Sequence, residues 1–184
     1  GKEGTMQARG ALMIEHRLIE RLITILEEMV RDVEATHAVS PAAVDAAVDF
    51  IRTYADRTHH GKEEDIMFRD LAGRSLSGEH RRLMEDLIQE HAVARRRVGE
   101  LVEASSRYRR GDAEAWADVA AAMRELVALY PGHIRKEDKV FFPAARRYVT
   151  EEEDRAMLDE FKEFDRLMIH EKYAAVVEAL RSKL

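Results

Sequence analysis

An apolar rhythm of three to four residues runs along almost the whole chain of 184 residues, and it limits the fold more than any other feature. This period places apolar side chains on one face of an α-helix, whereas a half-buried strand needs a period of two. Only 3 Pro and 9 Gly interrupt the rhythm, and no segment carries a strand pattern. We therefore expect an all-α protein.

Start and stop signals divide the rhythm into five helices. Ser40-Pro41 is typical of an N-cap followed by proline at the first helical position, and Gly111 is typical of the glycine that ends a helix. Thr150 and Glu153 match a capping box. The expected helices cover about residues 6–36, 41–71, 79–109, 112–142 and 150–184.

Short connections favour antiparallel neighbours, so we expect an up-down-up-down four-helix bundle with an additional C-terminal helix. Residues 1–10 are expected to be disordered or frayed, and residues 11–148 to form the bundle. Residues 149–184 should form the last helix, packed on the bundle or extending from it.

Composition excludes several classes of protein. The absence of Cys excludes disulfide scaffolds, thiolate zinc sites and iron–sulfur clusters, and it fits a reducing cytoplasm. A net charge of -6 argues against a nucleic-acid partner. No apolar run reaches the roughly 20 residues that cross a bilayer, and no secretory signal is visible. We expect a cytoplasmic protein with no membrane partner.

The chain also contains an internal repeat. Residues 59–68 align without gaps with residues 133–142, 74 positions later. A Glu-His pair recurs 75 positions apart, at residues 15–16 and 90–91. Each half therefore offers one single histidine and one His-x-x-x-Glu, as in a duplicated helical hairpin. The six motif residues are His16, His59, Glu63, His91, His133 and Glu137.

This set of residues predicts a metal site. A His and a Glu four positions apart on a helix lie one turn apart on the same face, so both reach one point of a bundle core. Four imidazoles and two carboxylates from four helices form the ligand set of a dinuclear iron or manganese site, and the same donors also suit zinc. Without a metal, their burial would leave costly unpaired polar groups. One His-x-x-x-Glu means little, but the repeated context and the order along the chain are specific.

At these residues the sequence resembles the hemerythrin family, specifically the hemerythrin-like proteins with an HHE cation-binding domain. The likeness covers about residues 12–147 and is carried by residues 14–16, 59–66, 90–91 and 133–138. It implies a four-helix bundle around two non-haem iron ions joined by an oxo or hydroxo bridge. By motif, the terminal ligands are His16, His59, His91 and His133, and the bridging carboxylates are Glu63 and Glu137.

The sequence departs from the oxygen-carrying members in one respect. Those members place two histidines four positions apart on the third helix, so that one iron has three imidazoles and the other has two. Here the positions four residues either side of His91 are Leu87 and Arg95. Each metal then has about two imidazoles and about one open position, which favours sensing, peroxide chemistry or metal holding over oxygen carriage.

Two carboxylates near the motifs leave the ligand set open. Oxygen carriers take the last carboxylate from an Asp five positions after the histidine, which is Asp138 here; the symmetry of Glu63 and Glu137 favours Glu137, with Asp138 on a solvated face. Glu20 lies one turn from His16 and could fill a missing position, or it could be an exposed helix carboxylate.

Other neighbours of the motifs are interpreted as supporting groups. We expect His60 and Glu64 one step off the bundle axis, as outer ligand support or surface residues. Glu15 and Glu90 either orient an imidazole through its second nitrogen or are solvated. Tyr130, like Tyr54, lies near the ligand turns and could donate a hydrogen bond to a bound oxygen species or simply be a core tyrosine.

The functional hypothesis is a di-iron hemerythrin-like protein that binds oxygen or a related small molecule such as peroxide or nitric oxide, as a sensor, scavenger or iron/oxygen store. The alternatives are a peroxide- or oxygen-reducing enzyme and a metal-responsive regulatory module. In the regulatory module the C-terminal helix would contact a protein partner.

Overall fold

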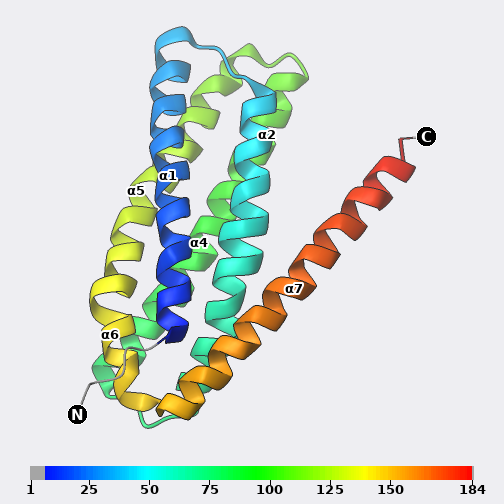
Figure 1. Ribbon diagram of the computed structural model, residues 1–184. Helices are drawn as coiled ribbons and strands as arrows, with labels where there is room; N and C mark the ends of the chain where they lie inside the picture. The colour runs from blue at the N-terminus through cyan, green and yellow to red at the C-terminus, as the bar shows by residue number, and fades with distance from the viewer. Residues whose placement is uncertain (1–6, 184) are drawn as a thin grey trace.

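The computed structural model describes residues 7–183, and nearly all of them are helical (Figure 1). The described part contains no strand, which confirms the all-α prediction. The α-helices are α1 (Gln7–Thr36), α2 (Pro41–Phe50), α3 (Arg69–Ala72), α4 (Gly78–Arg109), α5 (Trp116–Lys136), α6 (Phe142–Ala145) and α7 (Glu151–Arg181). The π-helical segments are η1 (Ile51–His60), η2 (Glu63–Phe68) and η4 (Glu137–Phe141), and short 3₁₀ turns are η3 (Ala113–Ala115) and η5 (Arg146–Tyr148).

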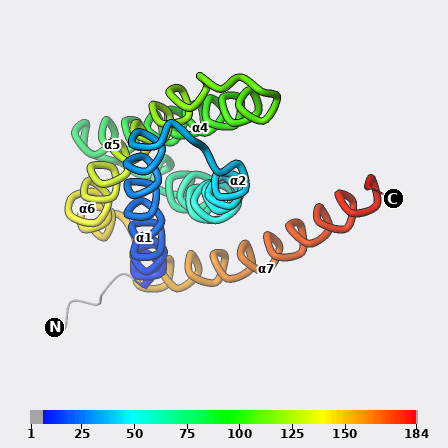
Figure 2. Tube along the Cα trace, turned by 90° about the horizontal axis from the view of Figure 1, so that it is seen from above, coloured from blue at the N-terminus to red at the C-terminus, as the bar shows by residue number. Residues whose placement is uncertain are grey.

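Four helical rods lie side by side as the predicted bundle. They are α1, the rod from α2 to α3, α4, and the rod from α5 to α6 (Figures 1 and 2). α1 and α4 both pack against α5, and α4 also packs against α2 and η1. The second rod becomes π-helical at Ile51 and the fourth rod at Glu137, so that π turns occur in both rods at the repeated His-x-x-x-Glu segment.

The helix boundaries follow the local signals in the sequence. The Ser40 side chain accepts a hydrogen bond from the Ala43 amide at 3.3 Å, which caps α2. Thr150 Oγ1 accepts one from the Glu153 amide at 3.1 Å, which caps α7. Gly111 has a φ of 103°, a conformation that favours glycine and ends the helix before it.

The sequence predicts a frayed start over residues 1–10. Residues 1–6 lie outside the described residues, and for residues 7–10 the prediction is wrong. Residues 7–10 already belong to α1, and Ala8 is buried. The amides of Gln7 and Ala8 donate to the Asp154 carboxylate at 2.7 and 3.2 Å. This carboxylate satisfies free amides at the positive end of α1, and therefore orders the first turn.

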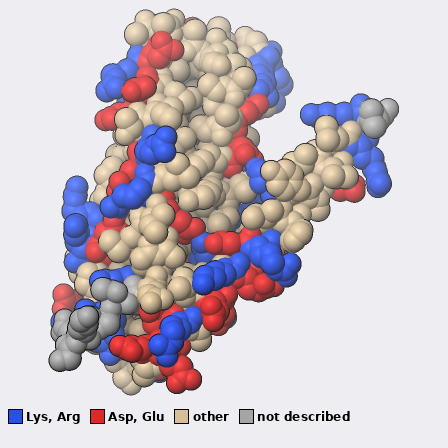
Figure 3. All heavy atoms as spheres, in the orientation of Figure 1, with Lys and Arg blue, Asp and Glu red and all other residues tan. Residues whose placement is uncertain are grey.

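α7 crosses the bundle and then leaves it (Figures 1 and 2). Met157 and Phe161 are buried against the bundle. Gly61 makes the close crossing feasible, because a Cβ at this position would lie only 2.7 Å from Phe164 Cζ. The second half of α7 shows a largely uncharged surface in Figure 3. Its exposed apolar side chains are Leu167, Ile169, Tyr173, Val176, Val177 and Leu180. Binding of a protein partner through this helix stays a prediction.

None of the helices in residues 7–183 is both long enough and apolar enough to cross a membrane.

Two clusters of apolar side chains fill the bundle, one on each side of a polar layer. On α1, Leu12 belongs to one cluster and Ile19 to the other, with buried His16 between them. The same order recurs on α4 around His91. The polar layer therefore lies at the level of the predicted metal ligands.

Candidate metal centre

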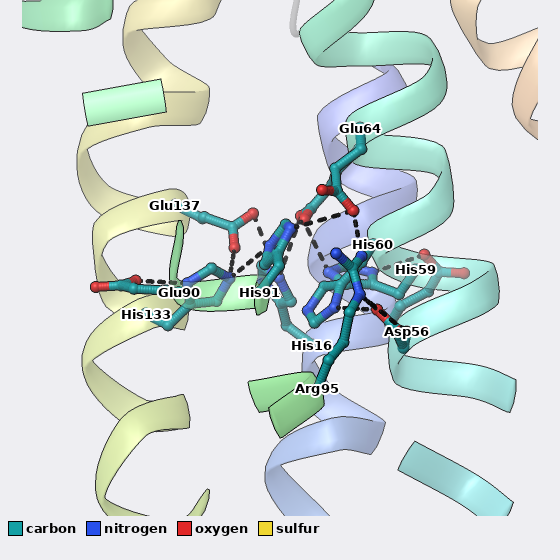
Figure 4. Close-up of polar contacts among 12 residues, drawn as sticks. His16, Asp56, His59, His60, Glu64, Glu90, His91, Arg95, His133 and Glu137 are labelled. Carbon is teal, nitrogen blue, oxygen red and sulfur yellow. Dashed lines mark hydrogen bonds and ion pairs between the residues drawn. The ribbon is translucent and has the colours of Figure 1, made fainter. Parts of the chain in front are cut away.

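The structure brings all six predicted ligand residues together in the middle of the bundle. Figure 4 shows His16, His59, His91, His133 and Glu137 there. Each of the four rods contributes, and every one of these side chains is buried. The six are His16 on α1, His59 on η1, Glu63 on η2, His91 on α4, His133 on α5 and Glu137 on η4.

The ligand atoms fall into two groups that share a carboxylate. One atom from each of His16, His59, Glu63 and Glu137 lies within 4.8 Å of the others. In the second group, one atom from each of Glu63, His91, His133 and His60 likewise lies within 4.8 Å of the others. Glu137 forms an ion pair with His133 of the second group. Both carboxylates therefore lie between the two groups, where a bridging ligand belongs.

The donor atoms at the centre fit a pair of metal ions. Both carboxylate oxygens of Glu63 and of Glu137 are buried without a hydrogen bond, and so are Nε2 of His16 and Nε2 of His59. His59 Nε2 lies 3.1 Å from Glu63 Oε1, but the pair lacks hydrogen-bond geometry. Buried polar atoms without partners are costly. Metal ions of the iron, manganese or zinc class would satisfy them, because imidazole nitrogen and carboxylate oxygen are the donors that these ions take.

Each of the four predicted ligand histidines has a carboxylate next to Nδ1, from a neighbouring helix. The separations are 2.7 Å from Asp138 to His16, 3.0 Å from Glu15 to His59, 2.7 Å from Glu90 to His133 and 3.7 Å from Glu64 to His91. The first three are hydrogen bonds, and the fourth is an ion-pair contact. A carboxylate that accepts from Nδ1–H leaves the Nε2 lone pair free for a metal.

These contacts decide several expectations. Of the two alternatives left open for Glu15 and Glu90, the contacts with His59 and His133 favour the one in which each carboxylate orients an imidazole. Asp138 is buried on His16, so its expected place on a solvated face is wrong, and its position favours Glu137 as the central carboxylate. Glu20 lies on the surface, where it pairs with Arg17 at 2.9 Å. The internal repeat could have indicated that Glu64 and Asp138 have the same role, because the two residues occupy equivalent positions in it.

A cation holds each of these carboxylates in turn. Lys62 Nζ lies 2.5 Å from Glu15 and 2.7 Å from Asp165 of α7, and the lysine is fully buried. Its equivalent in the repeat, Lys136, pairs with Glu90 but stays partly exposed. The remaining two pairs are Arg17 with Asp138 and Arg95 with Glu64.

The charges at the centre favour protonated imidazoles when no metal is bound. Burial lowers the pKa of His59, but the Glu63 charge and a hydrogen bond to Glu15 outweigh it and raise that pKa to about 10. For His133, burial is likewise outweighed by Glu137, and its pKa is raised to about 10. Burial opposes the ionisation of Glu63, yet the positive charge on His59 and the close polar contacts with His59 and His91 hold its pKa well below the usual value.

His60 lies inside the site, so its expected position off the bundle axis is wrong. It is 2% exposed, its ring stacks on His91 at 3.7 Å between centroids, and Nδ1 lies 3.1 Å from Asp56 Oδ1. The expectation assumed α-helical spacing, but η1 is π-helical, and its wider turns bring both His59 and His60 to the interior. Burial, reinforced by the charge of His91, holds the pKa of His60 well below its usual value.

A cavity of about 200 Å³ adjoins His60 at the side of the bundle. Tyr130 lines it, together with Asp56 and Arg95, whereas Tyr54 does not. The Tyr130 hydroxyl is buried without a hydrogen bond, and burial raises the pKa of this phenol. Tyr130 therefore keeps its proton and has a free donor next to the site.

Comparison with known proteins adds a match to the hemerythrin HHE cation-binding domain, over residues 8–145 and again over residues 83–184. Among curated proteins, uncharacterized proteins of Mycobacterium bovis and of two strains of Mycobacterium tuberculosis are each 25% identical over 152 residues. The alignment covers 83% of this chain and 58% of each relative, so the chain spans less than two thirds of their length. No solved structure shows a significant match.

Proposed function

The chain belongs to the hemerythrin HHE cation-binding family, and we propose that it is a non-haem di-iron protein that binds dioxygen or a related small molecule such as peroxide or nitric oxide. In this proposal it serves as a sensor, a scavenger or a store of iron or oxygen. The observation that carries the proposal is the set of buried carboxylate oxygens and imidazole nitrogens without hydrogen bonds, which meet at the centre of the bundle.

The side chains have distinct tasks in this proposal. His16, His59, His91 and His133 would hold the metals, and Glu63 and Glu137, which lie between the two groups of ligand atoms, would be shared by both. When bound, the iron pair supplies redox chemistry toward oxygen species. The carboxylates on Nδ1 fix the imidazole rings, and the two apolar clusters keep bulk water away from the polar layer.

Metal analysis and optical spectroscopy test the proposal directly. Protein produced with iron should contain about two iron atoms per chain. Its near-ultraviolet bands should change when dioxygen, peroxide or nitric oxide is added to anaerobic samples. The Glu63→Ala and His133→Ala variants should lose both properties, whereas Glu20→Ala, on the surface of α1, should keep them. Wild-type protein that retains no redox metal under these conditions would refute the proposal.

Tyr130 favours a second candidate function, the reduction of peroxide or oxygen. Its protonated hydroxyl has no partner and lines the cavity beside the site, where it could donate to a small oxygen species. The enzyme hypothesis predicts turnover with hydrogen peroxide that Glu63→Ala abolishes. Tyr130→Phe should slow this turnover and leave the iron content unchanged; equal rates in this variant would exclude a role for the phenol.

A further inference from the structure

His60 has the contacts of a metal ligand. One of its ring nitrogens lies within 4.8 Å of ligand atoms of Glu63, His91 and His133. Its ring stacks on His91, and its centroid is 5.8 Å from that of His133. Figure 4 shows it beside His91, pointing into the bundle. His60 therefore lies within reach of the same point as two of the predicted ligands.

The orientation of His60 matches that of the other four imidazoles. Its Nδ1 contacts a carboxylate, Asp56 Oδ1 at 3.1 Å on the same helix, so Nε2 is the ring nitrogen available to a metal. Asp56 is in turn held by the Arg95 guanidinium at 2.9 and 3.1 Å. The order of imidazole, carboxylate and cation is therefore the same as at His16, His59, His91 and His133.

Packing alone does not account for a histidine at this position. The equivalent residue in the second half of the repeat is Ile134, which is also buried. An apolar side chain thus suits this place in the bundle, and a buried imidazole there costs desolvation that a metal bond would offset.

We propose that His60 is a fifth imidazole ligand of the metal pair. This inference rests on the proposed di-iron function. One metal is then held by His60, His91 and His133, and the other by His16 and His59. Oxygen carriers have a second histidine on the third helix, where this chain has Leu87 and Arg95 on either side of His91. In this proposal the second helix supplies that imidazole instead.

The unequal distribution of imidazoles sets the number of open positions. With two bridging carboxylates and one solvent-derived bridge, the metal with three imidazoles has about six ligands and the other metal about five. A single position stays open, and it is on the metal held by His16 and His59. Under this proposal one metal has an open position, whereas the sequence alone predicts an open position on each.

The His60→Ile substitution tests the proposal, because the protein already accommodates isoleucine at the equivalent position 134. Wild-type diferric protein should show two unequal iron signals in Mössbauer spectra, and should bind one azide ion per iron pair. In His60→Ile the two signals should converge and a second azide should bind. Iron loss to a chelator should become at least about tenfold faster, because removal of even a residue that only supports a ligand lowers metal affinity by about 10- to 100-fold.

Chemical rescue separates a ligand from a packing residue. His60→Ala should enlarge the cavity of about 200 Å³ that His60 lines, so that free imidazole can enter. Added imidazole should restore the unequal iron signals in His60→Ala but not in His60→Ile. His80→Ala serves as the control, because His80 bonds the Tyr148 hydroxyl at 2.6 Å, away from the site.

The outcomes distinguish this inference from the proposed function. If wild-type protein binds iron and both His60 variants keep its Mössbauer spectrum and azide stoichiometry, His60 is not a ligand and the di-iron proposal stands. If wild-type protein retains no redox metal, both proposals fail. Circular dichroism of each variant establishes whether it is folded. If His60→Ile does not fold, the rescue of His60→Ala with imidazole still tests the proposal.

Discussion

Each imidazole of the site is supported outward by a carboxylate and then by a cation. Burial of a carboxylate next to an imidazole is costly unless its remaining oxygen finds a partner, and a lysine or arginine provides that partner. The consequence is that residues which never touch a metal control the orientation and basicity of those that would bind it.

Asp138 offers a test of this support. Asp138→Asn removes the charge that faces His16 Nδ1, and we expect metal affinity to fall by about 10- to 100-fold. Glu20→Gln is the matched control, since Glu20 also pairs with Arg17 but is exposed. Competition with a chelator measures both affinities, and equal values for the two variants would contradict the assigned role of Asp138.

The raised pKa values predict a pH dependence of the metal-free protein. His59 and His133 have pKa values of about 10 in the folded protein, above the 6.5 of a free imidazole. A raised pKa contributes stability that is complete below about pH 6.5 and is lost as the pH rises through about 10. The free energy of unfolding in urea should therefore decrease over this interval. Metal-loaded protein should lose less stability, because metal takes the place of the protons; a flat profile without metal would contradict the prediction.

At the scale of elements, the repeat provides pairs of residues that differ only in their surroundings. Lys62 is buried between Glu15 of α1 and Asp165 of α7, whereas its equivalent Lys136 pairs with Glu90 alone and is 39% exposed. Lys62→Met leaves Glu15 and Asp165 without their cation, and we expect a loss of about 3–5 kcal/mol. Lys136→Met should cost at most about 1 kcal/mol. Urea unfolding of both variants measures the difference, and similar losses would contradict the contact with α7.

The crossing of α7 depends on Gly61. Gly61→Ala brings a methyl group against Phe164, and we expect a loss of about 1–3 kcal/mol from overpacking, whereas Gly99→Ala, with open space around it, should gain up to about 1 kcal/mol. Adding Phe164→Ala should make Gly61→Ala nearly harmless. Double-mutant analysis of unfolding measures this coupling, and additive effects would place α7 elsewhere.

The helices could be predicted well because their signals are local. Ser40, Gly111 and Thr150 act within a few residues of their own positions, so the sequence alone locates the boundaries. The π turns of η1, η2 and η4 could not be predicted from a period of 3.6, and with them the burial of His60 was missed. The start of α1 was missed for another reason, since Asp154 orders it from 147 positions away in the chain.

At the scale of the whole molecule, the two halves are alike in their ligands and different in what surrounds them. The repeat located six polar residues that the structure gathers at one level of the bundle. It did not show that α7 packs on the second rod, although Gly61 and Arg135 at equivalent positions already distinguish the halves. Long-range packing of this kind depends on surfaces that meet only in the folded chain.

The polar layer between the two apolar clusters has a consequence for how the molecule unfolds. Without metal, the layer contains buried carboxylate oxygens and imidazole nitrogens that make no hydrogen bond, so we expect the two clusters to be joined weakly. We expect the metal-free protein to lose its two ends in separate transitions, with a calorimetric enthalpy above the van't Hoff enthalpy. Metal loading should merge them into one transition at higher temperature. Hydrogen exchange of the α1 amides follows both ends of this helix in one experiment. Equal protection of the amides before and after His16 in the metal-free protein would contradict this view. The metal pair would then decide whether the bundle behaves as one cooperative unit or as two.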